Sequence, residues 1–433
     1  MPIAITKSLH IAAPEHVAVY AQNPTYTSLG GRTLIEAVKW EARTPSGIYY
    51  HRRIFRRRSE DNGRTWVEEP PLAELADADI DRGCVVRSVP MHFLDPDNGL
   101  LVSLHTTAER AGSDTAFHGA ADLTSRTCRF WCEVSRDGGL SWEDHGQVVM
   151  AGPEFDEVHW APGIWYGRNR AQADMPPWVK LADGVVVLGV SVQPLGEDGE
   201  IFSPHGGYFL QTACLRGRWR EDLLSLPRTV GRASSPAMPS SPRLEWEMGA
   251  PISVGPELSS VGCCEPALAH LGGQRLLVTM RCQGYRDGSA PSLRFMATSE
   301  DGGLTWSAPE PLCFDDGEPV SSPASLAEFV RPAGSERLWW IGNIAPGPVY
   351  GQTPRYPLYI VEADPERLCL VRETMAVIDD WREGLPEDVR FTNWGSYQDR
   401  ETGEIVLTLP EQPRTSWEDL TSDCYRYRIA IEE

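Results

Sequence analysis

The chain has 433 residues and a formal net charge of −21, from 61 Asp and Glu residues against 40 Lys and Arg residues. Non-specific nucleic-acid binding and docking on an anionic membrane surface both need a surplus of Lys and Arg, so this charge balance argues against nucleic-acid and membrane partners. The hydrophobic fraction of 41% and the charged fraction of 23% are typical of a soluble protein that forms a core.

The chain also shows no targeting or metal-binding signature. Residues 1–10 contain no apolar run long enough for the central region of a signal peptide, and nowhere do about 18 consecutive apolar residues occur. The ten cysteines lack paired metal-ligand spacing, and the adjacent Cys263 and Cys264 do not suit a disulfide with each other. We therefore expect reduced thiols, a cytoplasmic protein, and no metal or other cofactor.

One eight-residue pattern, Ser-x-Asp-x-Gly-x-Thr/Ser-Trp, occurs three times, at 59–66, 135–142 and 299–306. It is typical of a tight hairpin turn, in which the Asp side chain accepts backbone N–H bonds and the Gly takes a φ that other residues resist. The indole is then free to pack between neighbouring sheets. The spacing between the second and third copies is about twice the spacing between the first and second. We therefore expect a degenerate copy midway between the second and third copies, at 214–219.

A second, weaker repeat consists of a turn followed by an apolar, β-rich run, and it occurs six times. The six segments are Gly30–Ile35, Asn98–Ser103, Asp183–Leu188, Gly273–Val278, Ser335–Trp340 and Gly403–Thr408. Each follows another strand-like stretch, so each resembles the first hairpin of a small antiparallel sheet. Six units of about 70 residues have the size of four-stranded propeller blades with long loops.

We therefore predict an all-β fold, a six-bladed β-propeller of four-stranded antiparallel blades, as a single domain over residues 1–433. The closing strand is expected at Tyr425–Ile431, with the strand His16–Tyr20 helping to close the ring.

Three such turns on a six-fold β pattern resemble the Asp-box (bacterial neuraminidase repeat) sialidase superfamily, over nearly the whole chain. The resemblance implies a sialidase-like propeller whose repeat turns lie on the face opposite the active site. Residues just before each first strand and just after each second strand should then converge on the other face, in a central funnel. In chain order these are Asn23, Glu41, Arg43, Arg87, His105, Asp174, Gln193, Glu265, Arg281, Ser321, Asn343, Arg355, Tyr397 and Glu411.

Several of these residues match the superfamily one by one. Glu265, followed one hairpin later by Arg281, resembles the glutamate and carboxylate-binding arginine of one blade, and Arg355 resembles the next arginine of that cluster. Tyr397 resembles the nucleophilic tyrosine. A tyrosine beside Glu265 makes chemical sense, because the carboxylate takes the phenol proton as the oxygen attacks the anomeric carbon. Arginines suit the substrate carboxylate because their planar fork binds it bidentately.

The first unit departs from the superfamily pattern. Its opening arginine is replaced by Asn23, and Glu41-Ala-Arg43 is kept without the aspartate that normally follows. We expect Arg87, in the second unit, to take the place of the missing carboxylate-binding arginine. The proton donor has three candidates, which are His51, His105 and Asp174.

Three functions remain open. The first is an exo-glycoside hydrolase acting on a terminal acidic or modified sugar, with Tyr397 and Glu265 as the nucleophile pair. The second is a polysaccharide lyase on a uronate-containing chain, in which Tyr397 or His105 removes the α-proton. The third is a non-catalytic carbohydrate-binding propeller. All three predict a carbohydrate partner, and none predicts the oligomeric state.

Overall fold

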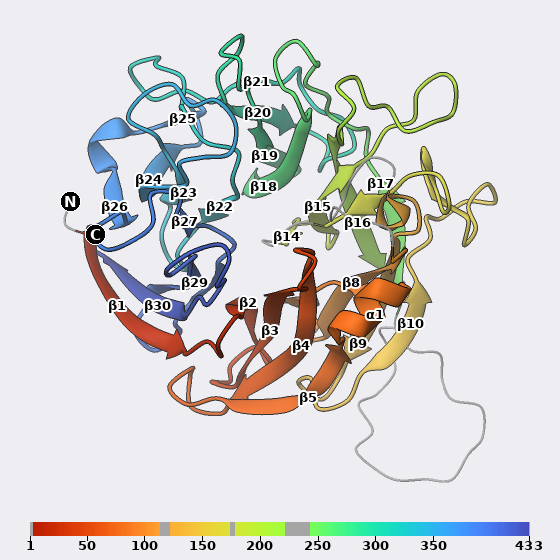
Figure 1. Cartoon of the computed structure of the whole chain (residues 1–433), viewed down its shortest axis with the longest axis horizontal. Helices are drawn as coiled ribbons and strands as arrows, with labels where there is room; N and C mark the ends of the chain where they lie inside the picture. The colour runs from red at the N-terminus through yellow and green to blue at the C-terminus, as the bar shows by residue number, and fades with distance from the viewer. Residues whose placement is uncertain (1–2, 113–121, 174–177, 221–242, 433) are drawn as a thin grey trace.

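The computed structural model describes residues 3–112, 122–173, 178–220 and 243–432. Six antiparallel sheets of four or five strands stand around a common centre (Figure 1). This arrangement is a six-bladed β-propeller, so the predicted fold class is confirmed. Helix is limited to α1 (Asp77–Arg82) and two 3-10 turns, η1 (Leu123–Ser125) and η2 (Arg372–Thr374), in the described part of the chain.

Each blade begins with an inner strand near the centre and continues outwards. The blades contain the following strands: blade 1, β2 (Ala18–Tyr26), β3 (Leu34–Arg43), β4 (Tyr49–Ser59) and β5 (Val67–Glu74); blade 2, β6 (Cys84–Arg87), β7 (Met91–Leu94), β8 (Leu101–Arg110), β9 (Arg129–Ser135) and β10 (Glu143–Gln147); blade 3, β13 (Ala171–Gln172), β14 (Val179–Lys180), β15 (Val186–Val192), β16 (Gln211–Trp219) and β17 (Leu244–Met248).

The second half of the ring follows the same plan. Its strands are: blade 4, β18 (Cys263–Gly272), β19 (Arg275–Cys282), β20 (Arg294–Ser299) and β21 (Glu310–Pro311); blade 5, β22 (Ala327–Val330), β23 (Leu338–Asn343), β24 (Leu358–Asp364), β25 (Cys369–Leu370) and β26 (Ala376–Asp379); blade 6, β27 (Arg390–Phe391), β28 (Gly395–Gln398), β29 (Ile405–Gln412), β30 (Cys424–Ile431) and β1 (Ile3–Ile11). A separate two-stranded sheet joins β11 (His159–Ala161) and β12 (Ile164–Trp165).

The two ends of the chain close the ring together. Strand β1 pairs antiparallel with β30, from Ile3 opposite Ile431 to Ile11 opposite Cys424, so the N-terminal strand is the outer strand of the last blade. The predicted closing strand at Tyr425–Ile431 is confirmed. The stretch His16–Tyr20 leads into β2, the inner strand of blade 1, and it contacts the last blade through a parallel bridge between Ala18 and Ser422, whereas residues 3–11 supply the closing strand itself.

The core lies between the blades. Along β23, both Trp339 and Trp340 are fully buried, although neighbouring side chains of a strand point to opposite faces. Trp340 belongs to an apolar cluster with blade 4, whereas Trp339 belongs to a cluster that contains Phe391 and Trp394 of blade 6. A middle blade is therefore covered on both faces, which explains the continuous apolar runs in the sequence.

The three repeat turns share one hydrogen-bond pattern. The N–H of Gly63 donates to Ser59 Oγ at 2.8 Å, and the N–H of Thr65 donates to Asp61 Oδ1, also at 2.8 Å. The other two turns repeat both bonds at 2.8 and 2.9 Å. The expected role of the Asp carboxylate is confirmed. The midway copy at 214–219 instead lies within strand β16.

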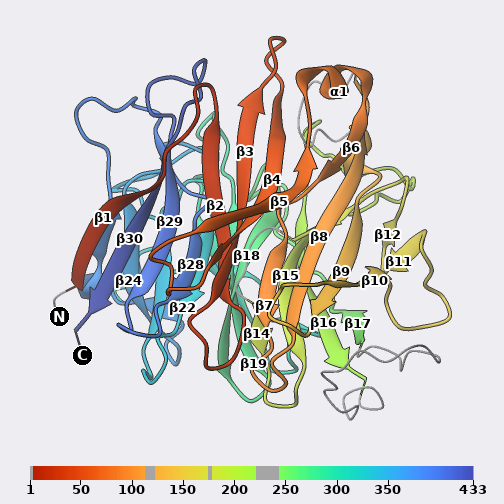
Figure 2. The same cartoon turned by 90° about the horizontal axis from the view of Figure 1, so that it is seen from below.

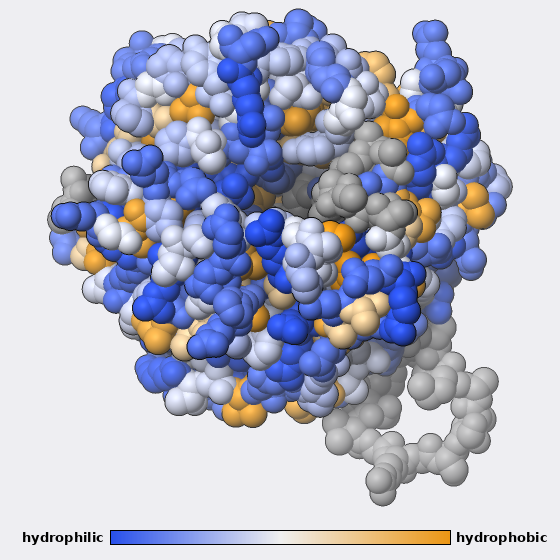
Figure 3. All heavy atoms as spheres, viewed as in Figure 1, coloured by the Kyte–Doolittle hydropathy of each residue, from blue (hydrophilic) through white to orange (hydrophobic). Residues whose placement is uncertain are grey.

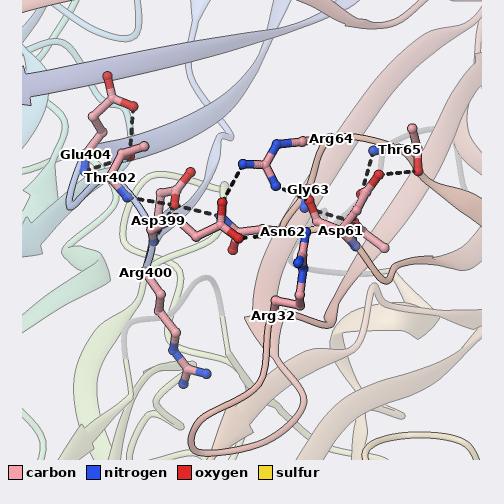
Figure 4. A network of polar contacts seen from close by, with 12 residues as sticks. Arg32, Asp61, Asn62, Gly63, Arg64, Thr65, Asp399, Arg400, Thr402 and Glu404 are labelled. Carbon is pink, nitrogen blue, oxygen red and sulfur yellow. Dashed lines mark hydrogen bonds and ion pairs between the residues drawn. The ribbon is translucent and has the colours of Figure 1, made fainter.

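The repeat turns lie at the same end of the blades as the turns between first and second strands, because successive strands run antiparallel. Figure 2 shows the hairpin between β3 and β4, together with α1, projecting from the opposite side. Figure 4 shows the first repeat turn beside the Asp399 turn of blade 6, where Asn62 donates to Asp399 at 2.7 Å. Arg64 also pairs with Glu401 of the same turn. This face is therefore structural, and the funnel is on the other side.

We predict that Gly139→Ala destabilises the protein more than Gly184→Ala. Both glycines have a φ near +80°, so each substitution carries a strain of about 1–3 kcal/mol. A Cβ at Gly139 would also lie 3.3 Å from Leu101 and Trp142, whereas a Cβ at Gly184 meets nothing within 4 Å. Chemical unfolding should show that Gly139→Ala lowers the free energy of unfolding by about 1–3 kcal/mol more than Gly184→Ala does. Equal losses would contradict tight packing beneath the turn.

Candidate functional site

A cavity of about 440 Å³ opens on the face that carries the β3–β4 hairpin. Figure 3 views this face, where hydrophilic residues surround a hollow near the centre of the ring. Blades 1, 5 and 6 supply the lining, which consists of Tyr20, Glu41, Tyr49, Tyr50, His51, Arg355, Asp388, Arg390, Asn393, Gln412 and Trp417. The cavity is therefore lined by three phenols, two arginines and two carboxylates, Glu41 and Asp388.

Two arginines lie side by side in this cavity. Arg355 and Arg390 form a parallel backbone bridge, and the N–H of Phe391 donates to the carbonyl of Arg355 at 3.2 Å. Burial and the nearby charges of Arg281 and Arg390 lower the pKa of Arg355 to about 9, and burial also lowers the pKa of Arg390. Among the described residues, neither guanidinium has a carboxylate within 4.0 Å. The carboxylates Glu41 and Asp388 also line the cavity and act on Arg390 from a distance, but among the described residues neither arginine forms a close ion pair.

The contacts of these two side chains fix their positions. Arg355 donates to the carbonyl oxygens of Ala324 at 2.8 Å and Gln352 at 3.2 Å. The Arg390 guanidinium lies 4.1 Å from the ring centroid of Trp417, and its buried Nε has no hydrogen-bond partner. The cation–π contact holds Arg390 in place without using its hydrogen-bond donors.

Glu265 and Arg281 form an ion pair beside this cavity. The pair joins the start of β18 to the end of β19, and Arg281 also donates to the hydroxyl of Tyr208 at 3.5 Å. Burial alone would lower the pKa of Arg281, but the charge of Glu265 outweighs it and the pKa is raised. Arg281 is therefore neutralised within the protein, in contrast to Arg355.

Glu265 has an unusual backbone conformation. Its φ is +49°, a region that residues other than glycine, asparagine and aspartate seldom adopt, and its N–H donates to Ser191 Oγ at 3.0 Å. The second carboxylate oxygen, Oε2, is buried and has no hydrogen-bond partner. Strain of this kind gathers at functional positions, which supports the predicted importance of Glu265.

A phenol and a carboxylate from blade 1 face the arginines. Tyr20 is 1% exposed and donates to Oε1 of Gln412. Burial and the charge of Glu41 raise the pKa of Tyr20 well above its ordinary value, so the phenol keeps its proton until a base removes it. Glu41, on the neighbouring strand β3, is the carboxylate that acts most strongly on this phenol.

His51 lies across from Glu41 on the paired strand β4. Its Nε2 is 3.4 Å from Lys39 Nζ, and burial together with that lysine lowers the pKa of His51 to about 3. Burial lowers the pKa of Lys39 as well. His51 is therefore uncharged at neutral pH, which argues against its predicted role as a proton donor.

The structure brings several predicted site residues together. Glu41 and Arg355 line the cavity, while Glu265 and Arg281 lie close enough to act electrostatically on Arg355. Arg87 lines a neighbouring cavity that shares Glu41 and His51 with the first.

Tyr397 is not brought to Glu265. Its strand, β28, pairs with β29 beside the Gly403 turn, and a Cβ on Gly63 would lie 2.7 Å from the Tyr397 hydroxyl. Tyr397 therefore lies at the repeat-turn face, at the far end of blade 6 from the cavity. The sequence comparison placed Tyr397 at the beginning of blade 6, whereas that blade begins at Arg390.

Other predicted residues also lie away from the cavity. Asn23 donates to the carbonyl of Pro90 at 3.0 Å between blades 1 and 2, because β2 begins five residues earlier, at Ala18. His105 is buried on β8, where burial and two arginines lower its pKa to about 3. Arg43 donates to Gly47 at the tip of the hairpin. Asp174 lies outside the described residues.

Sequence reasoning missed Tyr20, Arg390 and Gln412. The signal was present for Gln412, because it directly follows Glu411 at the end of the second strand of blade 6. Tyr20 belongs to the stretch His16–Tyr20, which was assigned to ring closure. Arg390 precedes the Asn393-Trp394 segment and pairs with Gln412, so it marks the true start of the blade.

The described residues contain no group of three or more His, Cys, Asp or Glu residues placed to hold a metal ion. None of their helices has the length and apolar character needed to span a bilayer.

The chain thus has a sialidase-like six-bladed propeller with a cavity that bears arginines and phenols on the face opposite its repeat turns. No protein-family model matches the sequence, and no curated protein matches it. Solved structures do match. A protein of unknown function from Dyadobacter fermentans is 14% identical, with a TM-score of 0.61 and full coverage of both chains.

Two further matches are sialidases by name. The NanB sialidase of Streptococcus pneumoniae is 11% identical, with a TM-score of 0.58, over 98% of this chain and 70% of that one. The intramolecular trans-sialidase of Ruminococcus gnavus, in complex with oseltamivir carboxylate, is 11% identical, with a TM-score of 0.56, over 95% and 94%. These similarities show the fold.

We predict that His105→Gln makes the stability of the protein less dependent on pH below about 6.5. An unfolded histidine binds a proton below about pH 6.5, whereas folded His105 stays neutral down to a pH of about 3. Unfolding therefore takes up a proton in this window, and stability falls as the pH falls, by about 1.4 kcal/mol per unit. Urea unfolding between pH 4 and 8 measures the difference between wild type and variant, and parallel curves would contradict the assignment.

Proposed function

We propose that this protein is a glycoside hydrolase that releases a terminal acidic sugar, whose carboxylate binds Arg355 and Arg390. The observation that carries the proposal is the pair of adjacent arginines in the cavity, neither of which forms an ion pair within 4.0 Å with a carboxylate of the described residues. The sialidase and trans-sialidase neighbours support an acidic sugar as the substrate.

The burial of two neighbouring guanidinium groups favours an anionic ligand. Taking two guanidinium groups out of water is costly, and the lowered pKa of Arg355 and Arg390 reflects that cost. A carboxylate between them would restore charge balance through short, charge-assisted hydrogen bonds. A neutral sugar would leave both guanidinium groups without a close ion pair, so the cavity should favour an acidic sugar over it.

Tyr20 is the phenol best placed to attack the sugar. As its oxygen bonds to the anomeric carbon, the glycosidic C–O bond breaks, and the phenol proton passes to Glu41 and from there to the departing oxygen. Water then attacks the anomeric carbon and breaks the tyrosyl–sugar bond. One proton of that water returns through Glu41 to the Tyr20 oxygen, so the net reaction adds water across the glycosidic bond. A neutral phenol avoids placing a carboxylate nucleophile against an anionic sugar.

Glu265 has a supporting part in this scheme. Its ion pair with Arg281 orients that arginine toward Tyr208 and the edge of the cavity. Because Arg281 is already neutralised, it contributes less to anion binding than Arg355 and Arg390.

The first test is a product assay on acidic glycans, with detection of reducing ends and of ultraviolet absorbance. Released saturated sugar supports hydrolysis. An ultraviolet-absorbing product would assign the cavity to a polysaccharide lyase, and binding without turnover would leave a carbohydrate-binding propeller.

We predict that Tyr20→Phe lowers kcat by about 10³-fold or more, because loss of a nucleophile removes the covalent route. Substrate binding should change little, since the ring remains. Tyr397→Phe is the matched control: its hydroxyl lies at Gly63 on the opposite face, and activity should be retained. The reverse pattern would restore Tyr397 as the nucleophile and refute the assignment of Tyr20.

We also predict that Arg355→Met and Arg390→Met each weaken the binding of an acidic sugar by about 10- to 100-fold, the loss of a charged hydrogen bond worth about 1.5–3 kcal/mol. Arg218→Met, at an exposed position on blade 3, serves as the control. Calorimetry measures the affinities. Unchanged binding in both cavity variants would remove the anion clamp from the proposal.

A further inference from the structure

Lysine is rare in this chain, and one of its few lysines lies behind the candidate nucleophile. The 40 Lys and Arg residues comprise 3 lysines and 37 arginines. Each lysine, Lys7, Lys39 and Lys180, forms an ion pair with a carboxylate of the protein. Lys39 differs from the other two because its partner, Glu41, lines the candidate site.

The strand register of blade 1 gathers the groups around Lys39. Tyr20 on β2 lies opposite Lys39 on β3, and His51 on β4 lies opposite Glu41. Lys39 and Glu41 are two residues apart on one strand, so their side chains leave the same face of the sheet. Neighbouring strands thus place a phenol, an ammonium, a carboxylate and an imidazole on one face.

The ammonium group of Lys39 contacts three of these neighbours. Its Nζ lies 4.3 Å from the ring centroid of Tyr20, 3.7 Å from Oε2 of Glu41 and 3.4 Å from Nε2 of the uncharged His51. The Lys39 side chain is 12% exposed and opens on the neighbouring cavity of about 300 Å³, whereas Tyr20 lines the first cavity. Lys39 therefore acts on a sugar in the first cavity through Tyr20 and Glu41.

The proton transfer of the proposed reaction moves one negative charge between the two partners of Lys39. Before the transfer the charge is on the Glu41 carboxylate, and as the phenol proton passes to Glu41 the charge develops on the Tyr20 oxygen. Tyr20 is buried, and an unpaired anion in a buried position is costly. A cation that contacts both groups stays close to the charge throughout the transfer, which lowers the barrier.

We propose that Lys39 is the positioning residue of the Tyr20–Glu41 pair, and that its positive charge supports the transfer of the phenol proton to Glu41. This inference rests on the proposed function. Lys39 keeps all three of its own protons during the step, and the proton that moves comes from Tyr20.

The titration of Lys39 makes the proposal testable. Burial lowers the pKa of Lys39, and the charge of Glu41 opposes this effect. Lys39 should therefore lose its charge below the ordinary lysine pKa of about 10.4, and kcat should fall in the same pH range. The other titratable groups around it are Tyr20, Glu41, His51, Arg87, Cys128 and Arg170.

The kinetic test uses the 4-methylumbelliferyl glycosides of N-acetylneuraminic acid and of glucuronic acid, in stopped assays from about pH 5 to about pH 11. Lys39→Met should lower kcat by about 10- to 100-fold with little change in KM, because Arg355 and Arg390 hold the sugar. Lys39→Arg should retain more activity, and its alkaline fall in kcat should lie at higher pH, because a guanidinium keeps its proton. Lys180→Met, at a lysine that is 11% exposed and paired with Asp95, should change neither kcat nor the pH profile.

A second test needs no substrate. Lysine labelled with ¹³C at Cε gives three NMR signals, one for each lysine of the chain, and the signal lost in Lys39→Arg belongs to Lys39. We expect this signal to titrate below the ordinary lysine pKa, in the pH range where kcat falls. Glu41→Gln should move the titration to still lower pH, because the carboxylate favours the charged ammonium.

The outcomes separate this inference from the proposed function. If the wild type cleaves either glycoside while Lys39→Arg leaves the alkaline limb unmoved, or Glu41→Gln leaves the Lys39 titration unmoved, the role of Lys39 is overturned and the proposed function stands. If the wild type cleaves neither glycoside, both proposals fail. Thermal unfolding confirms that each variant folds, and if Lys39→Met does not, Lys39→Arg and the NMR titration decide.

Discussion

The pairing of β1 with β30 is the interaction on which the rest of the structure depends. Six twisted sheets leave two open edges unless the first and last are joined, and here the N-terminal strand completes the last blade. The joint is reinforced by Lys7, which pairs with Asp379 at 2.7 Å and with Glu411 at 2.8 Å. On the repeat-turn face, Asn62 and Arg64 bind the Asp399–Glu404 turn. A closed ring holds blade 1 against blade 6, where the candidate site is formed.

The fold could be predicted from the sequence because each blade carries the same local sequence motifs. A serine, an aspartate and a glycine at fixed spacing determine a turn whatever surrounds them, and six turn-and-strand units count the blades. The site was only partly readable. Glu41, Glu265, Arg281 and Arg355 were located because they lie at the predicted strand ends. The predicted positions of Tyr397 and Asn23 along their strands were wrong by less than one strand length. An error of that size places a residue at the wrong end of a blade.

The remaining site residues could not be predicted, because packing between blades brings them together and no local sequence pattern indicates that packing. Tyr20 and Gln412 are hydrogen-bonded although nearly the whole chain separates them. Arg390 meets Arg355 through a bridge between two blades. The proposed chemistry depends on that proximity, because two neighbouring arginines that form no close ion pair within the described residues offer two guanidinium groups to one anion.

The position of the site at the seam of the ring has a consequence for synthesis. Tyr20 and Glu41 leave the ribosome long before Arg390 and Gln412. Until blade 6 emerges, β1 has no partner strand, and Tyr20 faces neither Arg390 nor Gln412. The growing polypeptide therefore carries no assembled cavity, and the cavity forms only when the ring closes.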